Sequence, residues 1–352
     1  MPRRAPPAGG PAADSERTSG GDLPRARPAD VGMLPELPQL LDRALDSRFR
    51  SVVGLVVLRR RCVVYERYAR GHGPGDPHNV ASVAKSVTSA LIGIAIASGR
   101  IESVDAPVLD FFPEYAPGSD RVPAVTVRHL LTMTAPFVLK ARGTRSEPLD
   151  RLRRQPDWVE YCVGLLDGSG APGTFQYGSA GFHLLSAILT RATGRSAREY
   201  ANERLFGPIG IPEIPRPPMG CFGRDEVFGN ASGWSSDPTG HSAGGWGLAL
   251  SPRDMARFGL LYLGRGAWEG RQVLPETWVE ESTAPNPNGY GYGWWLAGAG
   301  STFTFSAAGA GGSHVYCTPG KQLVVAIASR VSPRPPDRRW LLERCILPSV
   351  VD

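Results

Sequence analysis

Continuous apolar and β-branched runs stand near the two ends of the chain. Residues 51–58 and 62–68 are such runs around an arginine tip, which predicts an antiparallel hairpin. Residues 290–295 and 302–307 are strand-like as well. Residues 313–317 and 322–329 flank Thr318-Pro319-Gly320-Lys321, where Pro-Gly at the turn centre predicts a type II turn and a second hairpin. The strands therefore cluster at both ends of the chain.

Between these runs, apolar residues recur at spacings of three and four, which is the period of an amphipathic helix. The predicted helices are residues 34–46, 83–98, 157–166, 180–193 and 339–347, with further helices starting near Ser251 and Pro275. Thr126 can cap a short helix, and Ser196 with Glu199 forms a capping box. Residues 140–157 predict a surface loop, and residues 212–240 a functional loop.

This order of elements predicts an α+β fold. An antiparallel sheet is built from both chain ends, about residues 31–80 and 285–352, with flanking helices and a mostly helical region over about 81–284. Residues 1–30 are rich in Pro, Gly, Ala and Arg and lack periodicity, which predicts a disordered tail. Residues 31–352 are expected to form one domain.

The stretch Ser82-Val83-Ala84-Lys85 stands at the start of a predicted helix that Gly99 ends. A hydroxyl and an amine at positions i and i+3 share one face of a helix. The free N–H groups and the dipole at a helix N-terminus favour negative charge. A nucleophilic oxygen, and the oxyanion formed after its attack, are both stabilised there.

The Ser-x-x-Lys pattern is weak by itself. Of the 39 basic residues only three are lysines, Lys85, Lys140 and Lys321. A serine three positions before a given lysine arises by chance in roughly one case in fifteen. The alternative interpretation is a helix-capping Ser82 and a solvated Lys85, so the motif gains weight only from the other features of the chain.

Composition excludes several classes of protein. No apolar run approaches the ~18 residues of a membrane span, and no apolar stretch follows the charged start. We therefore expect a cytoplasmic protein without a membrane segment or a secretory signal. The net charge is +6, but the basic residues are thinly spread, which favours a solvated surface over a nucleic-acid interface.

The cysteines and histidines predict neither a metal nor a cofactor. The five cysteines form no Cys-x-x-Cys pair, and the six histidines no His-x-x-x-His. His129 lies among apolar residues and is expected to pack or cap. The tryptophans at 234, 246, 294 and 295 are equally compatible with an apolar acyl pocket and with the core. The oligomeric state stays open.

Several sequence motifs occur along the chain in the order that is typical of one family. The chain resembles, from about residue 30 onward, the serine β-lactamase and penicillin-binding-protein superfamily. It is most similar to the class C-like branch of serine hydrolases, with its esterases, D-amino-acid peptidases and 6-aminohexanoate-oligomer hydrolases. The matching phrases are residues 78–87, 101–114, 126–133, 173–177, 244–259 and 290–294. The resemblance implies a β-lactamase-like fold.

The resemblance assigns roles to individual residues. It implies catalytic Ser82, Lys85 and Tyr177, and Ser179 stands where this branch usually has an asparagine. The third motif falls in residues 307–314 without its usual cation, which argues against penicillins and peptide C-termini as substrates. The implied oxyanion donors are the N–H groups of Ser82 and Ser313. The implied substrate-binding residues are Ser179, Gly311 and Gly312.

These residues predict a serine hydrolase that cleaves a small ester or amide through an acyl-Ser82 intermediate. Lys85 can act as the base only if desolvation lowers its pKa. Alternatively Lys85 stays charged and lowers the pKa of Tyr177, which is then the base. An acyltransferase with the same nucleophile and a non-catalytic ligand-binding module on this scaffold remain alternatives.

Overall fold

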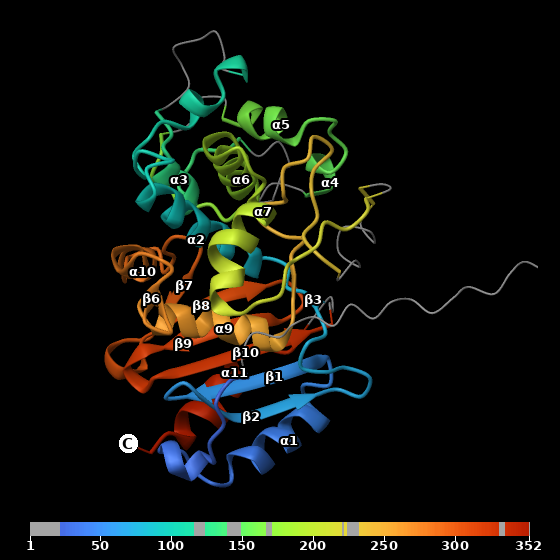
Figure 1. Ribbon diagram of the computed structural model, residues 1–352, viewed down its shortest axis with the longest axis vertical. Helices are drawn as coiled ribbons and strands as arrows, with labels where there is room; N and C mark the ends of the chain where they lie inside the picture. Colours follow the sequence, from blue (N-terminus) through green and yellow to red (C-terminus); the bar gives the residue numbers. More distant parts are fainter. Residues whose placement is uncertain are drawn as a thin grey trace, which may run out of the picture.

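The computed structural model describes residues 22–115, 124–138, 149–166, 171–219, 222–223, 232–330 and 335–351. Its centre is a six-stranded antiparallel sheet in the order β2-β1-β10-β9-β8-β7 (Figure 1). The strands are β1 (Val52–Arg59), β2 (Cys62–Tyr68), β7 (Trp295–Ala297), β8 (Thr304–Gly309), β9 (Ser313–Thr318) and β10 (Leu323–Ser329). Short pairs join β3 (His78–Asn79) to β4 (Ala249–Leu250) and β5 (Ala267–Trp268) to β6 (Arg271–Gln272).

The two ends of the chain meet at the pairing of β1 with β10, where Val57 lies opposite Val325. All eight residues of β1 are buried, because helices cover both faces of the sheet at this point. The predicted α+β fold, with an antiparallel sheet built from both chain ends and flanking helices, is confirmed.

The helices fall where the apolar period or a capping residue predicts them, except α4, which lies within the surface loop predicted at 140–157. They are α1 (Leu37–Ser47), α2 (Val83–Ala97), α3 (Val127–Leu131), α4 (Leu149–Leu152), α5 (Trp158–Gly164), α6 (Ala180–Thr193), α7 (Ala197–Ala201), α9 (Pro252–Leu263), α10 (Glu276–Thr283) and α11 (Arg339–Leu341). The last continues through a π-helical turn, Leu342–Ile346, and a 3-10 turn, Leu347–Ser349. Other 3-10 or π turns are Pro28–Val31, Val108–Phe111, Pro113–Tyr115, Asn202–Phe206, Gly207–Ile209, Gly300–Thr302 and Pro319–Lys321.

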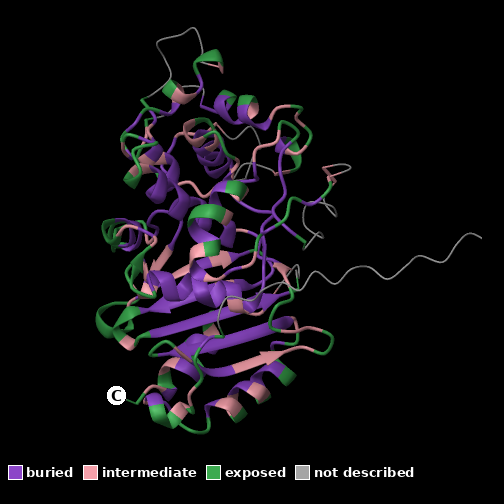
Figure 2. Cartoon of the chain, in the orientation of Figure 1, coloured by how far each residue is buried: buried purple, intermediate pink, exposed green. Residues whose placement is uncertain are grey.

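Two apolar cores lie on opposite faces of the sheet. The smaller core packs α1 and the C-terminal helical turns against one face, and the larger core joins α9, α2 and the helical region to the other (Figures 1 and 2). Helix α9 approaches the sheet closely because Gly259 has no side chain. A Cβ there would lie 2.6 Å from Cγ1 of Val324.

Three predictions were wrong in part. Residues 22–30 are not a disordered tail, because Leu23 is buried and the Ala26 N–H donates to the Val63 carbonyl at 3.1 Å. The turn between β9 and β10 is the 3-10 turn Pro319–Lys321, and the left-handed residue is Gln322 (φ 43°), not Gly320. Residues 290–294 form no strand of the main sheet, which begins there only at Trp295.

Some predictions fall partly or wholly outside the described residues. These are the tail over residues 1–21, residues 140–148 of the loop predicted at 140–157, and residues 220–221 and 224–231 of the predicted functional loop. Within 149–157 the structure places the short helix α4.

Candidate active site

Ser82 lies directly before α2, as predicted, and a strained residue places it there. Ala81 has a left-handed backbone (φ 47°), and its N–H donates to Oδ1 of Asn79 at 2.8 Å. This conformation is unfavourable by roughly 1–2 kcal/mol for a residue with a Cβ. The Asn79 side chain and the β3–β4 pair hold the turn, so the serine is presented at the N-terminus of a rigid helix.

Ser82 and Lys85 contact each other rather than capping a helix or reaching solvent. The Ser82 side chain makes no capping hydrogen bond, and Lys85 is only 1% exposed. Nζ of Lys85 donates to Oγ of Ser82 at 3.0 Å, to Oγ of Ser179 at 3.1 Å and to the carbonyl of Gly245 at 3.0 Å. The alternative of a solvated lysine is therefore wrong.

The three partners of Lys85 suit both of its protonation states. A charged ammonium has three N–H donors for three oxygens. A neutral amine has two N–H groups and a lone pair, so Ser82 can donate to it while the Gly245 carbonyl still accepts. Desolvation by burial lowers the pKa of Lys85, and the neighbouring Tyr177 acts in the opposite direction. Burial therefore makes the neutral amine of Lys85 accessible, and this amine lies within hydrogen-bond distance of the Ser82 hydroxyl.

Tyr177 completes the group that the sequence predicted. The centre of its ring lies 5.2 Å from Nζ of Lys85. The ring stacks on Trp295 at 5.3 Å and meets Tyr290 edge-on at 6.1 Å. These contacts fix the plane of the phenol, and Tyr177 itself is half-buried.

Ser179 takes a defined role at the second motif. It stands directly before α6 and its hydroxyl accepts from Lys85. The substitution of the usual asparagine amide by a hydroxyl therefore leaves a polar partner for the lysine.

Among the described residues, no contact joins Ser313, Gly311 or Gly312 to Ser82. The hydroxyl of Ser313 accepts from the N–H of Ser329 at 3.2 Å, on the neighbouring strand β10. Gly311 and Gly312 form the turn between β8 and β9, both with a left-handed backbone. A Cβ on Gly312 would lie 2.9 Å from Nε of Arg338, so this glycine faces the C-terminal helix.

The strand that approaches the nucleophile is β8. A Cβ on Gly309 would lie 2.2 Å from the carbonyl oxygen of Val80 and 3.3 Å from Cβ of Ala81. Only a glycine fits there, because the end of β8 packs against the turn that presents Ser82.

After Ser306, strand β8 has no paired strand on its β7 side, and we call this stretch its open edge. Pairing with β7 ends at Trp295 opposite Ser306. The Gly309 carbonyl accepts from the Gly312 N–H inside the hairpin, so the polar groups of Gly309 face β9. Because successive residues turn these groups to alternate sides, those of Ala308 face the open edge.

Gly245 is a contact that the sequence analysis did not assign. A Cβ there would lie 3.2 Å from Nζ of Lys85 and 3.3 Å from Cβ of Ser179. The motif at 244–259 contained Gly245, but nothing in the spacing of that motif indicated that the Gly245 carbonyl would meet Lys85.

Of the four tryptophans, Trp234, Trp246 and Trp294 are core residues, and Trp295 alone is half-buried beside Tyr177.

The segment that carries Gly245 is anchored by a buried pair. Nε2 of His183, on α6, lies 3.1 Å from Oδ2 of Asp237, and both side chains are fully buried. Burial by itself raises the pKa of Asp237, but the hydrogen bonds with His183 and His241 outweigh it and hold that pKa well below its usual range. The sequence analysis missed this pair, because its members are 54 positions apart.

Two further histidines, His129 and His314, lie elsewhere. Nδ1 of His129 accepts from the N–H of Thr126 at 3.0 Å, which is the expected capping role. His314 stacks on Tyr316 at 5.1 Å, and burial lowers its pKa to about 4. Within the described ranges, no group of three or more His, Cys, Asp or Glu side chains could hold a metal ion.

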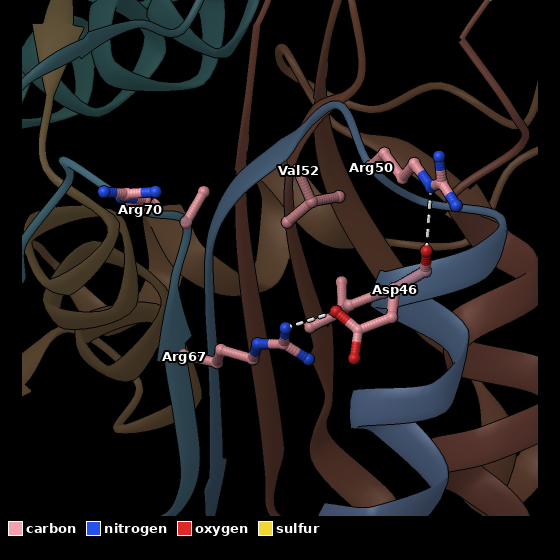
Figure 3. Close-up of a pocket in the computed structure, with 7 residues that line it drawn as sticks. Asp46, Arg50, Val52, Arg67 and Arg70 are labelled. Carbon is pink, nitrogen blue, oxygen red and sulfur yellow. Dashed lines mark hydrogen bonds and ion pairs between the residues drawn. The ribbon is translucent and has the colours of Figure 1, made fainter.

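A separate hollow of about 300 Å³ lies between the end of α1 and strands β1 and β2 (Figure 3). Its Arg67 pairs with the Asp46 carboxylate, and Nε of Arg50 donates to the Asp46 carbonyl at 2.8 Å. Its charge is thus partly neutralised, and none of its lining residues belongs to the Ser82 centre.

Comparison with known proteins identifies the family. The family model for β-lactamase matches residues 37–344. The chain therefore belongs to the β-lactamase family, and the predicted resemblance to the serine β-lactamase and penicillin-binding-protein superfamily is confirmed.

Individual relatives carry different names. The chain is 28% identical over 260 residues to a 6-aminohexanoate-dimer hydrolase of Paenarthrobacter ureafaciens, covering 71% of this chain and 60% of the relative. It is 29% identical over 206 residues to esterase EstB of Burkholderia gladioli, covering 51% of each. The chain thus matches between half and three-fifths of the length of these relatives. A D-stereospecific amidohydrolase from Streptomyces sp. superposes with a TM-score of 0.63 at 19% identity, over 87% of this chain and 97% of that one, which shows the same fold.

Proposed function

We propose that the protein is a serine hydrolase that cleaves a small ester or amide through an acyl-Ser82 intermediate. Oγ of Ser82 attacks the carbonyl carbon, Lys85 takes the hydroxyl proton, and the leaving group departs with a proton from Tyr177. Water then attacks the acyl carbon and gives a proton to the Tyr177 phenolate, the bond to Oγ of Ser82 breaks, and Lys85 returns its proton to that Oγ as the acid departs. The observation that carries the proposal is the hydrogen bond between a buried, carboxylate-free Lys85 and the hydroxyl of Ser82 at 3.0 Å, among the described residues.

Lys85 is the better-placed base for the first step. Its Nζ is within proton-transfer distance of Ser82, and its burial favours the neutral form that can accept a proton. The ring centre of Tyr177 lies 5.2 Å from that amine and the ring stacks on Trp295, so we propose that Tyr177 serves the leaving group instead.

The oxyanion requires two donors, of which the N–H of Ser82 is one. For the second we propose the N–H of Ala308 in place of Ser313, because Ala308 turns its polar groups to the open edge of β8 and directly precedes Gly309, which packs against Val80 and Ala81 before Ser82. The proposed donor stands five residues before Ser313 and still lies within residues 307–314, where the third motif was predicted.

The relatives bear names of both an amide hydrolase and an esterase, which supports the substrate class but not a choice within it. In the described part of the chain, no helix combines the length and apolarity needed to cross a membrane. We keep a small-molecule substrate in the cytoplasm as the working proposal.

Intact-mass spectrometry after incubation with a fluorophosphonate and a series of p-nitrophenyl esters tests this function. We expect one adduct on the wild type, none on Ser82→Ala, and an unchanged adduct on Ser47→Ala, a matched change at an exposed serine. Tyr177→Phe should acylate more slowly.

Labelling that persists in Ser82→Ala would overturn the proposal. No adduct from any reagent would favour the alternative of a ligand-binding module. Products formed with an added alcohol distinguish hydrolysis from acyl transfer.

A further inference from the structure

The segment 237–245 contacts both α2 and α6, two helices that pack against each other (Figure 1). It forms no helix and belongs to none of the named strands. On the α2 side, Lys85 donates to the Gly245 carbonyl, and Thr88 Oγ1 donates to the preceding carbonyl, that of Gly244, at 2.8 Å. Two adjacent carbonyls of the segment are thus bound by one face of the helix that follows the nucleophile.

On the α6 side, three polar residues share one face of the helix, because they are spaced by four and three positions. The first, Ser179, accepts from Lys85 at 3.1 Å, and the last, Ser186, donates to a backbone carbonyl of the segment at 2.7 Å. His183 stands between them, and its Nε2 lies 3.1 Å from Oδ2 of Asp237. The same face of α6 therefore contacts the amine at one end and the segment at the other.

The Asp237 carboxylate organises the beginning of the segment. Its Oδ1 accepts from the His241 N–H at 2.8 Å and from the Thr239 hydroxyl at 3.0 Å. Its Oδ2 meets His183 and also lies 3.2 Å from Nδ1 of His241. Each of these partners belongs either to α6 or to the segment itself, so the carboxylate fixes where the segment lies against the helix.

The pair of His183 and Asp237 fixes position more than it adds stability. Both side chains are fully buried, and Nε2 of His183 donates because the Asp237 carboxylate is ionised. A buried ionised group returns little net free energy after its desolvation, but leaving it without its partner is strongly unfavourable. A shift of the segment by about 1 Å would break the bond, so the segment has one position against α6.

The pair lies beside both neighbours of Gly245. A Cβ on Gly244 would lie 1.9 Å from the carbonyl oxygen of Phe182, the residue before His183 on α6. After Gly245, the centre of the Trp246 ring lies 6.4 Å from that of the His183 ring. Contacts at and next to His183 thus fix the backbone on either side of Gly245, and with it the direction of its carbonyl.

We propose that His183 and Asp237 are positioning residues for Lys85. They hold the Gly245 carbonyl against Nζ of that lysine and so keep the amine directed at the Ser82 hydroxyl. Neither acts on the substrate itself, and no proton passes through them. The proposal rests on the hydrolase function proposed above, in which this amine is the base.

The Gly245 carbonyl stabilises the charged form of Lys85 more than the neutral form, because an ammonium has three N–H donors and an amine two. The other groups that face the amine are the hydroxyls of Ser82 and Ser179 and the Tyr177 ring, and none of them belongs to the segment. If the carbonyl turns away, we expect the pKa of Lys85 to fall by about one unit. A role in stability alone would not move this pKa.

The chain has only three lysines, so carbon-13 labelling at Cε lets NMR follow the titration of Lys85 without any substrate. Asp237→Asn keeps the volume of the side chain but replaces one acceptor oxygen by a donor, and His183→Leu removes the ring nitrogens. We expect both variants to lower the pKa of Lys85 by about one unit. The plateau of kcat/KM for p-nitrophenyl acetate should fall about tenfold, because the amine loses its orientation.

Two further variants are the controls. His183→Gln keeps an N–H donor and should restore most of the shift. Asp254→Asn changes another buried carboxylate, which accepts from the Ser251 N–H at the start of α9, and should leave the pKa of Lys85 unchanged. A wild-type pKa in folded Asp237→Asn and His183→Leu would overturn the proposal.

Should neither variant fold, Lys85→Met tests the same link from the other end, because coupling between two sites is reciprocal. Loss of the amine frees the Gly245 carbonyl, so the Nε2 proton of His183 should exchange about tenfold faster, and unchanged exchange would contradict the proposal. If Ser82 forms no acyl adduct while the pKa shifts as expected, the hydrolase function fails and the positioning role stands. An adduct on Ser82 without the pKa shift gives the reverse result.

Discussion

Two buried cations on opposite sides of the sheet have nearly the same surroundings. Lys85 is bound by the hydroxyls of Ser82 and Ser179 and one carbonyl. Arg338 donates to Ser51 Oγ at 2.7 Å, to Ser329 Oγ at 3.2 Å and to the Pro336 carbonyl at 3.1 Å. Each is 1% exposed, and the oxygens that bind each of them in the described part of the chain belong to hydroxyls and carbonyls, not carboxylates.

The difference lies in what desolvation can do to each group. Burial lowers the pKa of both side chains. A lysine amine can lose its proton within a reachable pH range, whereas a guanidinium stays charged. The same environment therefore suits Lys85 to the role of proton acceptor that we propose, whereas Arg338 stays charged and joins the C-terminal helix to Ser51, directly before β1, and to β10.

Lys85→Met breaks the comparison on the catalytic side and should have the largest effect. We expect kcat/KM for p-nitrophenyl acetate to fall by about 10³-fold or more, because the base is lost. The free energy of unfolding in urea should stay equal or rise, since an apolar side chain replaces a desolvated amine. Lys321→Met, in the β9–β10 hairpin, is the control, and full activity in Lys85→Met would contradict the proposed base.

Arg338→Met tests the clamp. Loss of its hydrogen bonds leaves the hydroxyls of Ser51 and Ser329 without this donor, so we expect a loss of about 3 kcal/mol in the free energy of unfolding. The folded fraction should keep kcat/KM within about tenfold of the wild type. Arg344→Met, on the same helix but exposed, should change stability little. A large activity loss without destabilisation would place Arg338 in the site instead.

The pH dependence separates the two cations further. Because the pKa of Lys85 lies below 10.5 in the folded chain, the unfolded chain binds more protons between the lowered value and 10.5. Stability from this group therefore rises with pH across that window and is lost as pH falls through the folded pKa. We expect kcat/KM to rise about tenfold per pH unit below that pKa and then level off. A urea series on wild type and Lys85→Met should show the stability slope only in the wild type.

Gly245→Ala should have the smallest effect. The new Cβ would lie 3.2 Å from Nζ of Lys85, which must move by a few tenths of an ångström. We expect kcat/KM to fall several-fold, because the geometry between amine and Ser82 is disturbed. Gly164→Ala on α5, where a Cβ meets nothing within 4 Å, is the matched control. Equal kinetics for both variants would show that the Gly245 contact is not restrictive.

The helices were predictable because their signals are local. The start of α2 at Ser82, the end of α6 before Gly194 and the Ser196–Glu199 capping box all depend on residues a few positions apart. The third motif was harder, because its register depends on where β7 stops pairing with β8. That point is decided by strand contacts, which the period of two along one strand cannot reveal.

By itself, the sequence determined the α+β fold with a sheet built from both chain ends, the family, and the pairing of Ser82 with Lys85 on one helical turn. Only the tertiary structure decided that Lys85 is desolvated, that the Gly245 carbonyl meets it, and that the polar groups of Ala308 face the open edge of β8. The first set depends on local periodicity and spacing. The second depends on which distant segments exclude water together, and no short stretch of the chain contains that information.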